Sequence, residues 1–118
     1  MTPVETLQGM RDLLAGPKRW TQGARAKNAL GEDTNPIGED AVCWCIVGAY
    51  QRIATKEVRQ DIYEDFRADE AGQYLQREAF RLSDLKNPWS FNDLHTHPEV
   101  IALIDAALIN AKKDANVL

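Results

Sequence analysis

The sequence predicts a single compact, mainly α-helical domain of four or five helices around a central apolar helix at residues 41–54. Three observations lead to this prediction. The run from Asp40 to Ala49 is almost uniformly apolar and lies near the middle of the chain. Apolar residues recur three and four positions apart on both sides of that run. Two Thr-x-x-Glu sequences, at 2–5 and 96–99, are typical of helix starts.

The first helix is expected to begin at Thr2. Thr2 and Glu5 form a capping box, and Pro3 occupies the first helical position, where its missing N–H is not needed. The apolar stripe that follows consists of Val4, Leu7, Met10, Leu13 and Leu14. Gly16 and Pro17 end this helix.

Residues 18–39 are expected to form a long ordered loop or a short hairpin. Glycine, asparagine and proline interrupt the segment repeatedly. Mild alternation over residues 20–26 indicates one short strand. Because disordered segments contain few aromatic residues, Trp20 indicates that the loop is ordered.

The central helix is predicted to begin with Asp40 as its N-cap. Its main apolar face consists of Val42, Cys45, Ile46, Ala49, Tyr50 and Ile53. Cys43, Trp44 and Val47 make the sides apolar as well. A surface helix needs only one apolar stripe, so this helix should be buried. Gly48 lowers helix propensity by about 1 kcal/mol, and we expect it to admit a close neighbour.

A charged amphipathic region follows from about Thr55 to Ser83. The residues that mark its buried face are Val58, Ile62 and Phe66, then Ala71, Tyr74, Leu75, Ala79 and Leu82. A break between Asp69 and Gly72 would divide the region, and the pattern leaves open one helix or two.

A second irregular segment is expected from Ser83 to His95, and it contains Pro88. The last helix then opens at Thr96 with a second capping box, completed by Glu99. Its predicted core face consists of Val100, Leu103, Ile104, Ala107, Leu108 and Ala111. Its predicted solvent face consists of Asp105, Asn110, Lys112 and Lys113.

Composition excludes several classes of protein. The chain has 118 residues, 44% of them hydrophobic and 27% charged, as in an ordinary soluble domain. A formal charge of −4 argues against nonspecific binding to nucleic acid or to an anionic membrane. No apolar stretch approaches the ~20 residues of a membrane span. The N-terminus lacks the features of a secretory signal, and two cysteines one residue apart make no disulfide framework, so we expect a cytosolic protein.

Four sequence blocks occur in order between Trp20 and about Leu108. They are Trp20-x-Gln22-Gly23-Ala24, Ala41-Val42-x-Trp44-Cys45-x-x-Gly48-Ala49, Phe91-Asn92-Asp93, and Thr96-His97-x-Glu99-Val100-x-Ala102-Leu103. Together they resemble an uncharacterised family of small bacterial and phage proteins, a domain of unknown function. The resemblance implies no activity, cofactor or catalytic residue, and Cys43 is not part of the pattern.

A metal site is the first chemical hypothesis. Two thiols and two imidazoles have the composition of a structural zinc site, and the chain offers Cys43, Cys45, His95 and His97. On a helix, however, side chains two residues apart point about 200° apart. Both thiols would then not reach one ion. We therefore predict no metal and no cofactor, with the cysteines packed as small apolar side chains.

A cysteine or histidine hydrolase is the second hypothesis. The first turn of the predicted central helix carries Cys43 and Trp44, and a helix N-terminus lowers the pKa of a thiol. The residues that make the set resemble a papain-type hydrolase are Gln22, Asn92 and His97. The local papain-type signature is absent, and the charge of Asp40 opposes thiolate formation. Residues 95–98 also resemble the His-x-His-Pro of the zinc isopeptidases, but no serine follows them.

A binding surface is the third hypothesis. Irregular segments and helix starts often carry binding residues, and here they hold Trp20, Gln22, Trp89, Asn92, Asp93 and His97. The alternative is that the tryptophans seal the core while the Asn-Asp pair satisfies turn backbone. We therefore expect a cytosolic accessory protein that binds an unidentified protein or small molecule. A small hydrolase that uses Cys43 or His97 is the alternative, and whether the chain forms a homo-oligomer stays open.

Overall fold

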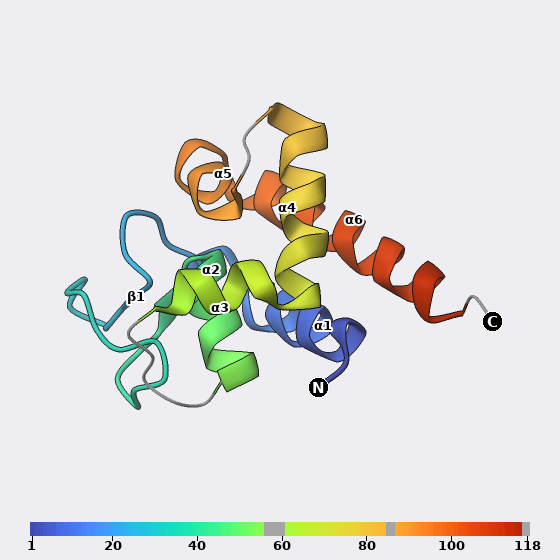
Figure 1. Ribbon diagram of the computed structural model, residues 1–118. Helices are drawn as coiled ribbons and strands as arrows, with labels where there is room; N and C mark the ends of the chain where they lie inside the picture. Colours follow the sequence, from blue (N-terminus) through green and yellow to red (C-terminus); the bar gives the residue numbers. More distant parts are fainter. Residues whose placement is uncertain (56–60, 85–86, 117–118) are drawn as a thin grey trace.

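The computed structural model describes residues 1–55, 61–84 and 87–116, and these confirm the mainly α-helical class (Figure 1). The helices are α1 (Pro3–Leu13), α2 (Ile46–Tyr50), α3 (Ile62–Ala68), α4 (Glu70–Ser83), α5 (Pro88–Leu94) and α6 (His97–Ala115). The shorter elements are the 3-10 turn η1 (Pro17–Arg19), the π-helical turn η2 (Gln51–Thr55) and the strands β1 (Ala26–Lys27) and β2 (Cys43–Trp44). Four or five helices were expected. The described residues form six, because α5 was not expected.

Helices α1, α4 and α6, which we call the helical part, pack directly on one another. α6 crosses both other helices, and its C-terminal half projects away from the loops, so that the molecule measures 47 × 27 × 24 Å (Figure 1). The predicted core face of α6 is confirmed, since Val100, Leu103, Ile104, Ala107, Leu108 and Ala111 are all buried. On α1, Leu7, Met10 and Leu14 are fully buried, whereas Val4 and Leu13 are half-buried.

Both predicted capping boxes are present. The Glu5 carboxylate accepts a hydrogen bond from the Thr2 backbone N–H (2.9 Å), and the Thr2 hydroxyl accepts one from the Glu5 N–H (3.1 Å). At α6, the Glu99 carboxylate accepts from the backbone N–H and the hydroxyl of Thr96 (3.0 and 2.9 Å). The Thr backbone bonds, followed by the hydroxyl bonds, lower the pKa of Glu5 and of Glu99.

The predicted start of the central helix is wrong. Residues 43–44 are a strand, and the helix begins at Ile46 with Cys45, rather than Asp40, as its N-cap. A short apolar run fits a buried strand as well as a buried helix, and here pairing with β1 decides for the strand. The central position is nevertheless confirmed, because every residue of α2 is buried.

Gly48 admits a close neighbour, as predicted. A Cβ atom at this position would lie 1.8 Å from the backbone oxygen of Arg25. That oxygen accepts the hydrogen bond of the Cys45 N–H (3.1 Å), so the strand segment lies directly against the first turn of α2. Only glycine fits this contact without moving the backbone.

The charged region contains two helices, which settles the open choice. Asp69 ends α3 and is the N-cap of α4, where its carboxylate accepts from the Ala71 N–H (3.0 Å). The predicted start of this region and Val58 lie outside the described residues. The prediction that residues 83–95 are irregular is wrong, because α5 forms within this segment. Its N-cap is Asn87, whose side chain accepts from the Ser90 N–H (2.8 Å).

Residues 20–45 together with α5 form what we call the loop part, at the end of the molecule opposite the free end of α6 (Figure 1). The expectation of an ordered loop or hairpin is confirmed, but of the one short strand predicted at residues 20–26 only the last position is a strand. β1 covers only residues 26–27 and pairs antiparallel with β2, while Trp20 makes an isolated bridge to Trp44. The intervening loop is held by hydrogen bonds to the Pro36 oxygen from the Trp44 indole (2.8 Å) and from Arg52 (3.2 Å).

Candidate functional site

Asn92 is the centre of a hydrogen-bond cluster that joins α5 to residues 20–22 and to α2. Its Oδ1 accepts from the Trp20 indole N–H (2.8 Å) and from the Ile46 backbone N–H (3.1 Å). Its Nδ2 donates to the Thr21 carbonyl (3.0 Å) and to Asp93 Oδ1 (3.3 Å). Because Asn92 is fully buried and uses both polar atoms twice, its side chain fixes the surrounding backbone.

Gln22 and His97 extend this cluster. Gln22 Nε2 donates to the carbonyls of Asn92 (2.9 Å) and His95 (2.8 Å), and so satisfies the C-terminal end of α5. His97 Nε2 lies 2.6 Å from the Leu14 carbonyl, and its ring lies 5.7 Å from the Trp20 ring. Four predicted site residues, Trp20, Gln22, Asn92 and Asp93, thus form one connected group, with His97 packed against it.

A cleft of about 120 Å³ lies next to this cluster and shares Asp93 with it. Its lining residues come from the 23–25 segment, the start of α2, α3 and α5: Gly23, Ala24, Arg25, Cys45, Tyr63, Trp89 and Asp93. Trp89 and Asp93 are the two predicted site residues that face it. Trp89 does not join the Asn92 cluster but packs edge-on against Tyr63, with ring centroids 5.0 Å apart.

The cleft carries one positive and one negative side chain. Asp93 Oδ1 accepts from the Gly23 N–H (3.1 Å), which holds the carboxylate at the rim. Among the described residues, no hydrogen bond or ion pair is found for the Arg25 guanidinium, which therefore does not pair with Asp93. Burial is the main factor that raises the pKa of Tyr63. The charges of Cys45 and Asp93 add to this increase, and Arg25 opposes it. The charges of Arg25 and Asp93 thus both act on the Tyr63 hydroxyl, in opposite directions.

Cys45 lies at the inner wall of the cleft and is not suited to be a nucleophile. Its Sγ accepts from the Gly48 N–H (3.4 Å) at the start of α2. Burial raises the pKa of this thiol to about 11, so it is protonated at neutral pH. Cys43, which was predicted to lie in a helical first turn, lies in β2, half-buried, with Sγ 3.9 Å from the Lys27 carbonyl.

Cys43 and Cys45 do not share a helix, contrary to the geometry from which the absence of a metal site was predicted. Residues 43–44 are extended, and Cys45 precedes the helix. His95 stacks on Phe91 with the ring centroids 3.9 Å apart, and its Nδ1 lies 3.0 Å from the Phe91 carbonyl. Within the described ranges, no three His, Cys, Asp or Glu side chains are grouped so that they could hold a metal ion.

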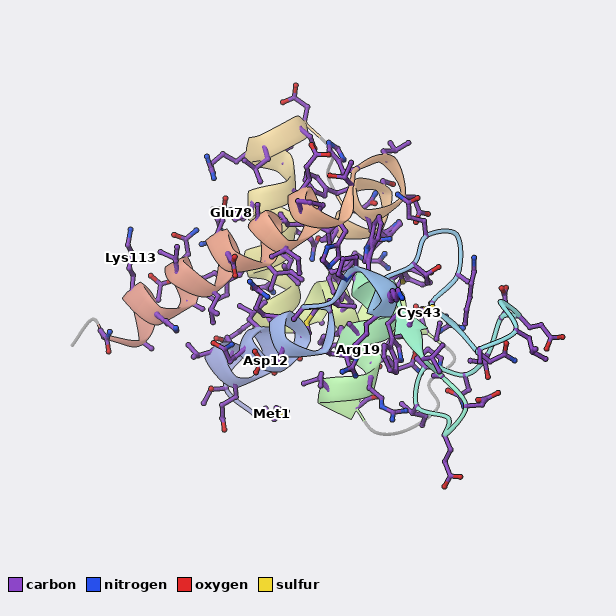
Figure 2. All side chains as sticks on the ribbon, turned by 180° about the vertical axis from the view of Figure 1, so that it is seen from behind. Met1, Asp12, Arg19, Cys43, Glu78 and Lys113 are labelled. Carbon is purple, nitrogen blue, oxygen red and sulfur yellow. The ribbon has the colours of Figure 1, made fainter. Side chains whose placement is uncertain are left out.

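Two further hollows lie away from the Asn92 cluster. A groove of about 410 Å³ runs between the start of α1, α4 and the free end of α6, and Tyr74 and Lys112 are among its lining residues. A second hollow of about 190 Å³ lies between α4, α5 and α6, and Leu82 and His95 are among its lining residues. Figure 2 shows Cys43 on the loop part and Lys113 near the free end of α6, so the large groove and the loop part lie at opposite ends. None of the six predicted site residues lines either hollow.

Sequence reasoning missed Arg25 and Tyr63. Tyr63 was passed over because it lies next to Ile62, outside the apolar stripe, and it is 37% exposed. The sequence signal that could have identified Tyr63 is an aromatic residue directly next to the core position Ile62. No local signal identifies Arg25, because its place in the cleft depends on contacts with α2 and α5.

These features define a small α-helical protein with an aromatic-rimmed, doubly charged cleft fixed by one buried asparagine. Residues 1–109 match the family described as "Family of unknown function (DUF6197)", and the chain belongs to that family. This confirms the expected membership of an uncharacterised family. Comparisons with curated proteins and with solved structures give no match. No described helix is both long and apolar enough to cross a membrane.

Proposed function

We propose that this protein is a non-catalytic binding protein and that the cleft beside Trp89 and Asp93 receives its ligand. The observation that carries the proposal is the convergence of Arg25, Tyr63, Trp89 and Asp93 on one small cleft. Concave sites that combine aromatic walls with a few placed polar groups are the usual form of small-molecule sites. The two cysteines, free of disulfides, support a cytosolic location, and a bacterial or phage source is part of the same proposal.

The Asn92 cluster supports this proposal because it makes the cleft rigid. Gly23, Ala24 and Arg25 line the cleft from a loop segment, and loops are mobile unless something holds them. Asn92 bonds to Trp20 and Thr21 on one side and to Ile46 on the other. A site whose backbone is already fixed loses less entropy when a ligand binds.

The geometry favours binding over hydrolysis. A cysteine hydrolase needs a thiolate next to a base. The predicted nucleophile, Cys43, has its Sγ 3.9 Å from the Lys27 carbonyl oxygen, which is an acceptor and not a base, and the Cys45 thiol is protonated at neutral pH. His97 Nε2 bonds to the Leu14 carbonyl rather than to a nucleophile. We therefore expect alkylating reagents to modify Cys45 only upon unfolding. Alkylation of Cys43 in the folded chain that is already rapid at neutral pH, and does not increase at higher pH, would instead favour the hydrolase.

Screening a chemically diverse fragment library by two-dimensional NMR tests the proposal. We expect bound fragments to shift the Trp89 indole signal and the amide signals of Gly23 and Ala24. A Trp89→Ala variant has no Trp89 indole signal, and in it the amide shifts of Gly23 and Ala24 should be lost. The matched control is Tyr74→Ala, which alters the groove at the free end of α6. Fragments that bind only at that groove, or no fragment that binds at the cleft, would overturn the proposal.

A further inference from the structure

The two charges of the cleft define the kind of ligand that it can hold. Arg25 and Asp93 line the same space of about 120 Å³ and form no ion pair with each other among the described residues. An anionic ligand would gain from the guanidinium but would be repelled by the carboxylate. A cationic ligand would meet the opposite problem, because like charges at close range disfavour binding.

The Asp93 carboxylate is held in place by one of its two oxygens. Oδ1 accepts hydrogen bonds from the Gly23 N–H and from Asn92 Nδ2, and among the described residues Oδ2 has no hydrogen bond. The Arg25 backbone is held because its carbonyl accepts a hydrogen bond from the Cys45 N–H. The Arg25 guanidinium has no hydrogen bond or ion pair within the described residues, and guanidinium groups bind carboxylates with two parallel hydrogen bonds.

The aromatic side chains limit the rest of the ligand. Trp89 and Tyr63 pack edge-on and form an apolar wall beside the two charges. Phe66 and the Arg67 guanidinium also pack on this indole, 6.2 and 5.9 Å from its ring. A cleft of about 120 Å³ has room only for a small ligand.

Building on the proposed function, we infer that the cleft binds a small zwitterion of the α-amino-acid type. Its carboxylate faces the Arg25 guanidinium, its ammonium group faces Asp93 Oδ2, and its side chain contacts Trp89 and Tyr63. Such a ligand satisfies both charges at once, which a singly charged molecule of the same size does not.

NMR titration of the full chain tests this inference with alanine, propionate and ethylamine as probes. We expect alanine to shift the Trp89 indole and Gly23 amide signals, and to bind about tenfold or more tightly than either singly charged probe. Arg25→Gln and Asp93→Asn should each weaken alanine binding about tenfold or more. The matched controls Lys113→Gln and Glu39→Gln change the net charge equally at exposed positions and should have no effect.

The outcomes separate this inference from the proposed function. If propionate or ethylamine binds the cleft as tightly as alanine, or if alanine does not bind while uncharged fragments do, the zwitterion assignment is overturned and the binding site stands. If the two variants bind alanine as well as the native chain does, the assignment of Arg25 and Asp93 is overturned. If no probe or fragment shifts the Trp89 indole or Gly23 amide signals, the proposed function is overturned as well.

Discussion

The helical part and the loop part of this molecule are held together by different kinds of interaction. In the helical part, α1, α4 and α6 contact one another mainly through apolar residues at helical spacing, such as Met10, Leu75 and Leu103. In the loop part, hydrogen bonds join residues about 70 positions apart, as from Trp20 and Gln22 to Asn92. Apolar spacing is visible in the sequence of each helix. Long-range hydrogen bonds depend on both partners, so no single segment reveals them.

Asn92→Leu is the substitution that we expect to destabilise the loop part most. This change keeps a side chain of similar size but leaves the Trp20 indole N–H, the Ile46 N–H and the Thr21 carbonyl without their partner. Each buried unsatisfied group costs about 1–3 kcal/mol, so we expect the free energy of unfolding to fall by roughly 3–5 kcal/mol. Urea denaturation measures this loss.

Asn110→Leu is the matched control in the helical part. Asn110 makes one side-chain hydrogen bond, to Glu78, and Glu78 also pairs with Arg81. We expect this variant to lose only about 1 kcal/mol. Equal losses for the two asparagine variants would contradict a special role for Asn92.

The second comparison uses two glycines within helices. In Gly48→Ala the new Cβ would lie 1.8 Å from the backbone oxygen of Arg25, so the backbone of the 23–25 segment and α2 must separate. We expect a loss of about 3 kcal/mol. In Gly9→Ala the Cβ meets Ile53 Cγ2 at 2.8 Å, so a side chain rather than backbone has to shift, and the loss should be smaller. The gain in helix propensity of about 1 kcal/mol should then leave stability within ~1 kcal/mol of the native value.

The buried thiol of the loop part should make stability depend on alkaline pH. The pKa of Cys45 is raised from 9.0 to about 11 in the folded chain. Between these values the unfolded chain releases the thiol proton and the folded chain retains it, so stability falls as pH rises from 9 to 11. The expected loss is on the order of 2 kcal/mol.

Cys45→Ser isolates this effect. A serine hydroxyl keeps an N-cap acceptor and does not titrate in this range. The difference in unfolding free energy between pH 9 and pH 11 should therefore be smaller for Cys45→Ser than for the native chain, and unchanged for Cys43→Ser. A native-like alkaline loss in Cys45→Ser would show that other groups cause it.

The smallest expected effect concerns the independence of the helical part. Thr2→Ala removes the hydroxyl that accepts from the Glu5 N–H and should cost about 1 kcal/mol. Because Thr2 has no contact with Asn92, the losses in a Thr2→Ala, Asn92→Leu double variant should add to within about 0.5 kcal/mol. Clear non-additivity in calorimetric unfolding would show that the two parts are coupled more closely than their contacts indicate.

The local sequence predicted what local interactions determine. The capping boxes at Thr2 and Thr96, the core face of α6 and the break at Asp69 all follow from spacing and end residues. The start of the central helix was misplaced because the run from Ala41 to Ala49 suits a buried strand or a buried helix. α5 was missed although Asn87 and Pro88 are a typical N-cap and first helical residue.

The candidate site was predicted only in part. Trp89 and Asp93 line the cleft, and Trp20, Gln22 and Asn92 form the cluster behind it, so irregular segments did indicate the correct region. The division of roles between these residues was not predictable, because Asn92 and Asp93 are neighbours in sequence but one is buried and the other exposed. Arg25 could not be predicted because its backbone contact with Cys45, 20 positions further along the chain, helps to place it in the site.

Hydrogen exchange in the native chain and in Asn92→Leu tests whether Asn92 holds the loop part. We expect the Trp20 indole N–H and the Ile46 amide to lose nearly all protection in the variant, while the amides of Leu103 and Ile104 in α6 stay protected. If Trp20 and Ile46 in the variant stay as protected as α6, Asn92 does not hold the loop part.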